Sequence, residues 1–443
     1  MHTLRTAGVA ILLASASLAS EAAVSEQEVA ELRQQVQALM ARVEQLEARN
    51  QQLAAGAAPA ARIEELEVRV TDVEAISQAQ TERITQAAAA AKASDWAGRI
   101  KWRGDLRYRH ETIEQERLIT EAEDFKQTRQ RIRARFGLEA AINDSLRAGF
   151  RIATGGALDP RSANVTLGDS NQRKEIRLDL AYVDWTIFEG TVLTAGKQAQ
   201  PWFRAGSSLF YDNDVNPEGV ALRWRGKSGV FANAWGYWLS ESAIGADGNL
   251  FGAQVGWETA VGLTAAVSYH DYGALQGSSL TFAGFPAGNS VYLGDASCNV
   301  PAATLVNRCY VYDYDILGLS LQYDLKVAGL PLQLWAEYVE NLDPEELNSG
   351  YSVGATLGKA SSPGSWELGV LYQDVERDAQ WAGILDSNLA DGDTQGKGLR
   401  VRGSWAPVRN VAVNLTWFDN TLDYDTPSER DYERMQLDLN FRF

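Results

Sequence analysis

The stretch Gly98-Arg99-Ile100-Lys101-Trp102-Arg103-Gly104-Asp105-Leu106-Arg107-Tyr108-Arg109 alternates between two kinds of residue. Every second residue from Ile100 to Tyr108 is apolar, aromatic or glycine, and the residues between them are charged. Successive side chains of a β-strand point to opposite faces, whereas a helix would spread both kinds around its circumference. The stretch therefore predicts a strand with one apolar face and one charged face.

The same period of two recurs farther along the chain. Residues 129–140 and 146–152 alternate apolar side chains with arginine. Residues 175–182 continue the pattern, which predicts that Tyr182 shares a face with the apolar residues of this segment. Repeated short strands with one apolar face indicate an all-β protein.

The connections between these strands alternate in length. Short turns are expected at 143–144, 189–190, 227–228, 258–259, 327–329, 363–364 and 407–408. Long polar connections are expected near 111–128, 155–173, 199–218, 240–249, 273–310, 341–349, 377–397 and 420–430. Short turns on one side and long loops on the other are typical of outer-membrane barrels. A soluble solenoid or sandwich would not require this alternation, so the sequence predicts about sixteen antiparallel strands.

The overall composition is compatible with a membrane barrel. The mean hydropathy of -0.26 argues against a bundle of membrane helices. A barrel has only alternate residues facing lipid, so its hydropathy can be this low. The last strand alternates as well and ends on Phe443, which resembles the aromatic end of outer-membrane barrels. We therefore predict an all-β transmembrane barrel over residues 96–443, in the Gram-negative outer membrane.

The N-terminus has the parts of a secretory signal. Arg5 precedes an apolar stretch from Ala7 to Ala19, and small residues follow up to Ala23. A positive start, a short apolar core and small residues are typical of a signal peptide. Roughly 13 apolar residues are also too few to span a bilayer comfortably. Residues 1–22 are therefore predicted to direct export and to be removed.

Residues 23–95 are predicted to form a periplasmic α-helical coiled coil. The a positions are Val29, Val36, Val43 and Asn50, and the d positions are Leu32, Leu39, Leu46 and Leu53. Four heptads of this regularity favour a coiled coil over a lone amphipathic helix. The segment 54–59 breaks the phase, and a weaker series follows from Ile63 to Val73. Valine at a with leucine at d favours two strands.

Two cysteines, Cys298 and Cys309, lie eleven positions apart. An exported protein meets an oxidising compartment, so a local disulfide is expected. A metal site would need more ligands, and no histidine lies nearby. We therefore expect a disulfide, with no metal and no other cofactor.

The sequence also argues against catalysis and against nucleic-acid binding. The three histidines are His2, His110 and His270, and no catalytic constellation can be placed around them. The net charge of -17 disfavours a nucleic-acid partner. We therefore expect a protein that is not an enzyme.

The chain resembles the proteobacterial family of putative porins that carry an N-terminal coiled coil before a sixteen-stranded barrel. The resemblance rests on the heptads from Val29 to Leu53, the opening strand 102–109, the segment 131–135 and the segment 195–198. It covers nearly all of the chain after the signal. The resemblance implies a homotrimer and passive transport. Phosphate-selective porins are similar in plan, but this chain lacks a dense lysine run in its loops.

The resemblance further implies that the third long loop folds into the barrel. Its charged residues are Arg204, Asp212, Asp214 and Glu218. Opposite this loop we expect a pore-lining basic ladder, consisting of Arg103, Arg107, Arg131, Arg133, Arg135, Arg147, Arg151 and Arg177. Acids facing guanidiniums would set a transverse field that governs selectivity. The alternative is that these arginines pair with Asp105, Glu139, Glu175 and Asp179.

The expected function is passive diffusion of small hydrophilic solutes or ions through a water-filled barrel. The expected partners are membrane lipid, lipopolysaccharide, the solutes, and peptidoglycan through the coil. A second hypothesis is an envelope tether or adhesin, which the barrel anchors and which acts through its coiled coil.

Overall fold

The computed structural model describes residues 34, 37, 38, 40–49, 59–118, 124–156, 159–241, 246–279, 287–294, 298 and 307–443. The predicted signal peptide, residues 1–22, lies outside these ranges, as do Val29, Leu32, Val36, Leu39, Asn50 and Leu53 of the heptad series. The chain divides into two compact units, Met1–Ile100 and Lys101–Phe443. Each unit is described by itself.

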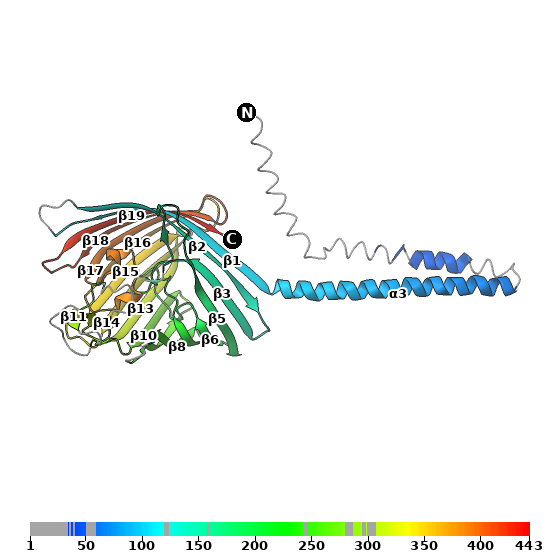
Figure 1. Cartoon of the computed structure of the whole chain (residues 1–443), viewed down its shortest axis with the longest axis horizontal. Helices are drawn as coiled ribbons and strands as arrows, with labels where there is room; N and C mark the ends of the chain where they lie inside the picture. Colours follow the sequence, from blue (N-terminus) through cyan, green and yellow to red (C-terminus); the bar gives the residue numbers. More distant parts are fainter. Residues whose placement is uncertain are drawn as a thin grey trace, which may run out of the picture. The chain divides into compact units, whose positions relative to one another are not determined.

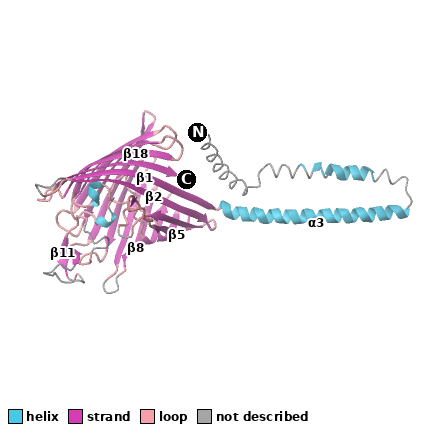
Figure 2. Ribbon diagram, turned by 45° about the horizontal axis from the view of Figure 1, so that its top comes forward, coloured by secondary structure: helices cyan, strands magenta, loops and turns pink. Residues whose placement is uncertain are grey.

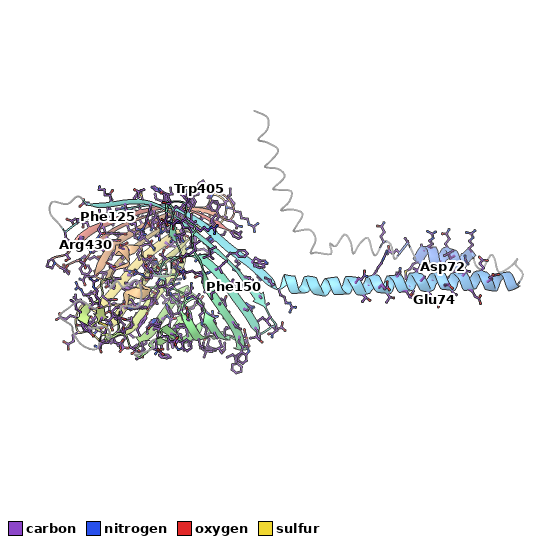
Figure 3. All side chains as sticks on the ribbon, viewed as in Figure 1. Asp72, Glu74, Phe125, Phe150, Trp405 and Arg430 are labelled. Carbon is purple, nitrogen blue, oxygen red and sulfur yellow. A yellow bond between two sulfur atoms is a disulfide. The ribbon has the colours of Figure 1, made fainter. Side chains whose placement is uncertain are left out.

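The first unit contains the long helix α3 (Pro59–Gly98) (Figure 1). The helix begins at a proline, whose fixed φ angle and missing N–H suit a first turn. Figure 3 labels Asp72 and Glu74 on this helix. Between them Val73 is 65% exposed, and Val70, one turn earlier, is 55% exposed. Among the described residues, none covers these apolar side chains, and the coiled coil that would cover them stays a prediction.

Residues 41–49 are helical as well. Val43 and Leu46, which occupy predicted a and d positions, are both exposed. Within the described ranges, no helix combines the length and the apolar character that a membrane span requires.

The second unit is a closed antiparallel β-barrel (Figure 2). It also contains two short 3-10 helices, η1 (Ala382–Ile384) and η2 (Leu389–Gly392). Its wall consists of β1 (Ile100–Gln115), β2 (Phe125–Ala141), β3 (Leu146–Thr154), β5 (Ile176–Phe188), β6 (Thr191–Lys197), β7 (Glu218–Arg225), β8 (Val230–Ser240), β9 (Gly248–Glu258), β10 (Leu263–Tyr272), β13 (Tyr314–Val327), β14 (Leu330–Asn341), β15 (Ser349–Gly358), β16 (Trp366–Val375), β17 (Gly396–Trp405), β18 (Val411–Leu422) and β19 (Arg430–Arg442). Three further short strands lie outside this ring: β4 (Val165–Thr166), which pairs with β2, and the hairpin of β11 (Val291–Gly294) and β12 (Asn307–Tyr310). The prediction of sixteen antiparallel strands is therefore confirmed for the described part of the chain.

Pairing of the first and last strands closes the barrel. Leu106 lies opposite Phe441, and Tyr108 lies opposite Leu439. The backbone N–H of Gly104 donates to the carbonyl of Phe443 at 2.9 Å, and the N–H of Phe443 donates back at 3.0 Å. Closure satisfies the edge groups of both strands, which a bilayer could not do.

Outward-facing apolar side chains form the outer surface of the barrel. Phe150 of β3 and Trp405 of β17, both labelled in Figure 3, are 45% and 51% exposed. Between the described strands, seven connections of two to seven residues alternate with eight connections of seven to 41 residues around the ring. Several strands run farther than their sequence suggests. For example, β1 and β2 leave only residues 116–124 between them, instead of a loop near 111–128.

The prediction that Tyr182 shares the apolar face of β5 is wrong. The register between β3 and β5 shifts at one point: Arg151 lies opposite Leu180, but Ile152 lies opposite Leu178, so Asp179 has no partner on β3. This bulge gives β5 an extra residue and reverses its alternation. The Tyr182 ring instead covers Gly149, on the same face as Arg151.

Candidate functional site

The candidate site is an inward-facing wall of polar and charged side chains on five adjacent strands: β17, β18, β19, β1 and β2. On β1 the exposed residues Trp102 and Leu106 face outward, so Arg103 and Arg107 point into the barrel. On β2 the exposed Phe136 faces outward, so Arg133, three residues earlier, points into the barrel. The alternation read from the sequence thus places the predicted arginines of both strands on the lumen side.

Most of the predicted basic ladder is paired with carboxylates. Asp105 accepts from Arg133 Nη2 at 2.9 Å and from Arg135 Nε at 2.7 Å. The other pairs are Arg103 with Glu139 at 3.3 Å, Arg177 with Glu175 at 2.5 Å, and Arg151 with Asp179. These are the four acids of the pairing alternative, so the charge of this part of the ladder is largely compensated locally.

A second cluster surrounds Glu111, which no pattern in the sequence distinguishes from the other acids. Its carboxylate is fully buried and accepts from Arg434 Nε at 2.9 Å and Nη2 at 2.5 Å. Arg129 also donates to it, and Arg131 Nη1 lies 3.7 Å away. The cluster crosses β19, β1 and β2, so only closure of the barrel brings it together.

The third long connection, residues 198–217, folds inward and is held by side chains of the opposite wall. The N–H of Phe203 donates to Gln254 Oε1 at 2.7 Å, and the N–H of Ala205 donates to Glu337 Oε1 at 2.7 Å. The N–H of Gly206 donates to Gln322 Oε1 at 2.8 Å. Lumenal side chains of three different strands thus satisfy backbone groups of this loop, which we call the constriction loop.

The charged residues of the constriction loop have separate roles. Asp214 lies 3.6 Å from Arg133 and 3.5 Å from Arg135, so it links the loop to the basic wall. Arg204 donates to the Tyr211 carbonyl at 2.8 Å and to Asn213 Oδ1 at 2.6 Å, and thereby shapes the loop itself.

The structure places Glu218 outside this loop. Glu218 is the first residue of β7 and shares a face with the outward-facing Val220 and Leu222. It pairs with Lys197 at 2.8 Å. In the sequence Glu218 follows Asp212 and Asp214 and was therefore grouped with them. It already belongs to β7, in which successive side chains face opposite sides of the barrel wall.

A second inward segment, residues 376–395, was not expected from the sequence. The N–H of Asp212 donates to the Ile384 carbonyl at 2.7 Å, and the N–H of Ser387 donates to Asp212 Oδ2 at 3.2 Å. The N–H of Asp386 donates to the Leu209 carbonyl at 3.0 Å. We call this segment the second inward loop, and together with the constriction loop it narrows the lumen.

The disulfide hairpin supports the second inward loop. Cys298 and Cys309 are bonded, which confirms the predicted disulfide. Between β10 and β13, Asn289 Nδ2 donates to the carbonyls of Arg377 and Gln380 at 2.9 and 3.0 Å. Tyr310, next to Cys309, accepts from Trp381 Nε1 at 3.1 Å. The disulfide therefore lies beside the groups that hold this loop.

Two cavities follow the basic wall. The first, of about 750 Å³, is lined by Arg103, Asp105, Arg107, Arg133, Arg135, Arg151, Glu367, Arg402, Asn440 and Arg442, among others. The second, of about 510 Å³, extends to Arg204, Asp212, Asp214, Asp386 and Asn388. Both are lined by Arg107, Arg133, Arg402 and Asn414, so they adjoin at these residues. Of the predicted ladder, Arg131, Arg147 and Arg177 line neither cavity.

Asp212 gives the contact between the two inward loops a pH dependence. Burial, and then the negative charges of Asp386 and Asp214, raise the pKa of Asp212 well above its usual range. A carboxyl whose pKa is raised on folding contributes stability that is fully present below its unfolded pKa of about 4. That contribution is lost as the pH rises through the folded pKa of Asp212, so a rise in pH should loosen the contact between the two loops.

We expect single-channel current to become noisier as the pH rises from about 4. Asp212→Asn, which cannot ionise, should flatten this dependence. Asp144→Asn, in an exposed turn, should leave it unchanged. Equal pH profiles for the wild type and Asp212→Asn would contradict the assignment.

A family model described as "putative porin" matches residues 115–301 and 310–443, well over half of the chain. No curated protein matches at a significant level. Among solved structures, the high-pH structure of Pseudomonas putida OprB is similar, with 12% identity and a TM-score of 0.50, over 77% of this chain and 94% of that one. Salmonella typhi OmpF in complex with daunomycin has 12% identity and a TM-score of 0.47, over 78% and 97% of the two chains. At this identity the OprB likeness shows the fold alone.

Proposed function

Because the chain belongs to the putative porin family, we propose that it lets small hydrophilic solutes and ions diffuse passively through its lumen. It is a multi-pass protein of the Gram-negative outer membrane. The observation that carries the proposal is the pair of adjoining polar cavities along one wall of a closed barrel. A barrel of sixteen strands is wide enough for an aqueous channel.

The charges along this route favour anions. The side chains that line the first cavity include seven arginines and one lysine, but only two carboxylates, Asp105 and Glu367. In the second cavity Asp212, Asp214 and Asp386 of the two inward loops lie opposite the arginines of the wall. Charged rings at a narrow point set the selectivity of a channel. A net excess of guanidinium groups attracts anions, and the acids of the loops impose a transverse field.

Purified protein in a planar bilayer under a salt gradient should give a zero-current potential of anion-preferring sign. Arg107→Gln with Arg133→Gln should reduce this preference, because both residues line the two cavities. Arg147→Gln should have a smaller effect, because Arg147 lines neither. A cation-preferring wild type would overturn the proposed preference, and the absence of conductance would overturn the porin.

We propose that the protein assembles as a homotrimer through both units. The exposed Val70 and Val73 on α3 support a role for this helix in pairing with other copies of the chain. The apolar outer surface of the barrel then contacts membrane lipid and lipopolysaccharide, and the helical segment binds peptidoglycan. The tether hypothesis draws on the same helix, whose 40 residues extend about 60 Å at 1.5 Å per residue.

A further inference from the structure

The disulfide hairpin lies outside the pore lining but is bonded to a loop that narrows the lumen. It consists of β11, β12, the Cys298–Cys309 disulfide and residues 287–290, which lead into β11. Among the described residues of the connection between β10 and β13, none lines either of the two cavities. The second inward loop, by contrast, brings Asp386 and Asn388 to the second cavity. The contact between hairpin and loop therefore connects the pore lining with a segment outside it.

Asn289 is the centre of this contact. Its side chain is 3% exposed. The Nδ2 atom donates to the carbonyls of Arg377 and Gln380 at 2.9 and 3.0 Å, and Oδ1 accepts from the N–H of Ala382 at 2.9 Å. One side-chain amide thus satisfies three backbone groups of the second inward loop, because it combines two N–H donors with an acceptor.

The neighbours of Asn289 extend the contact along the loop. Ser290 donates to the Asp378 carboxylate through its backbone N–H at 2.9 Å and through its hydroxyl at 2.5 Å. The N–H of Thr394 donates to the Ala287 carbonyl at 2.9 Å. The hairpin therefore holds the second inward loop near its beginning and near its end.

Between these two points the second inward loop reaches the lumen in a conformation that needs support. Residues 386–387 are hydrogen-bonded to the constriction loop. Farther on, Ala390, Asp391 and Gln395 have positive φ angles of 48°, 54° and 55°. Residues other than glycine rarely adopt such angles and keep them only where the surrounding contacts determine them. Without the hairpin contacts, we expect the loop to relax away from the constriction loop.

We propose that the disulfide hairpin sets the width and the charge of the pore from outside the pore lining, with Asn289 as the positioning residue of the second inward loop. The hairpin keeps this loop against the constriction loop, and the loop keeps Asp386 in the second cavity. The disulfide ties the chain beyond β11 back to β12 and so keeps the hairpin closed. The proposal deepens the proposed function and rests on it, because pore width affects transport only in a conducting channel.

Asn289→Leu removes all three hydrogen bonds and keeps a side chain of similar size. We expect the detached population of the second inward loop to rise by more than about tenfold, so the single-channel conductance should rise. The zero-current potential should also move toward stronger anion preference, because Asp386 then leaves the second cavity. A loss of stability alone would not move this potential. Ser290→Ala removes one of the two hydrogen bonds to Asp378 and should shift both quantities in the same direction by less.

Gln276→Leu is the matched control. Gln276 belongs to the same connection, and its amide donates to the Val311 carbonyl at 3.1 Å, away from both inward loops. It should keep the wild-type conductance and potential. Wild-type values in Asn289→Leu, with folding verified by the circular dichroism of the barrel, would overturn the proposal, as would equal shifts in Asn289→Leu and Gln276→Leu. If Asn289→Leu does not fold, the same comparison with Ser290→Ala decides.

Proteolysis in detergent tests the role of Asn289 without any conductance. Asn289 binds the carbonyl of the Arg377–Asp378 peptide bond, which an arginine-specific protease should reach only when the loop detaches. Because cleavage follows the population of the opened state, Asn289→Leu should be cut there at least about tenfold faster than the wild type and Gln276→Leu. Equal cleavage of all three proteins in a conducting channel would overturn the role of Asn289 and leave the porin. Faster cleavage of Asn289→Leu, with a wild type that does not conduct, would overturn the porin and leave the positioning of the loop.

Discussion

Replacing Glu111 by alanine is expected to destabilise the barrel strongly. Its carboxylate is fully buried and faces the guanidiniums of Arg434, Arg129, Arg131 and Arg109, the last at 3.8 Å. Removing one partner of a buried ion pair leaves uncompensated charge and typically costs about 3–5 kcal/mol. We therefore expect a clearly lower temperature of barrel unfolding in detergent, measured by the loss of its β-sheet circular dichroism.

Two further variants separate charge from other effects. Glu111→Gln keeps the shape and hydrogen-bonding capacity of the side chain, so a similar loss would identify the charge as the cause. Glu114→Ala removes an acid from the same strand. Its partner Lys126 lies 3.0 Å away, but both side chains are more than half exposed, and such pairs contribute about 0–1 kcal/mol. If Glu111→Ala and Glu114→Ala unfold at the same temperature, the cluster does not stabilise the barrel.

Removing the wall contacts of the constriction loop is expected to enlarge the channel. In Gln254→Ala with Glu337→Ala, the N–H groups of Phe203 and Ala205 lose their acceptors. An unsatisfied buried group costs about 1–3 kcal/mol. The double variant should therefore raise the detached population of the loop by more than about tenfold. The single-channel conductance should therefore rise, and the single-channel current should become noisier as the loop detaches and returns.

Gln333→Ala is the matched control for this experiment. Gln333 also belongs to β14, but its amide donates to Asp324 Oδ1 at 2.9 Å and touches no inward loop. It should conduct as the wild type does. Unchanged conductance in the double variant, with folding verified by the circular dichroism of the barrel, would show that the loop is held by other contacts.

The basic ladder shows where sequence patterns stopped being informative. Alternation places Arg103, Arg107 and Arg133 on the lumen side. Alternation does not predict which arginines pair with a carboxylate. Asp105 of β1, for example, forms ion pairs with both Arg133 and Arg135 of the neighbouring strand β2. Arg402 has the same inward alternation, but it lies far along the chain from the ladder, and no local pattern shows that it lacks an ion-pair partner among the described residues.

The inward loops show the same limit for the channel. The predicted constriction loop does fold inward, yet its holding residues Gln254, Glu337 and Gln322 are single polar positions in unremarkable strands. Residues 376–395 read only as a long polar connection. Their inward packing depends on contacts with Asp212 and with Asn289, which lie far away in the sequence.

The barrel, its sixteen strands, the alternation of turns and loops, and the disulfide could all be predicted from the amino-acid sequence. These features follow from local periodicity and from spacing, since a strand has to place its side chains alternately toward lipid and lumen. Which charges are compensated and which loops narrow the lumen became visible in the three-dimensional structure. Those properties arise when closure of the ring brings β19 beside β1, and neither strand contains information about its neighbour's side chains.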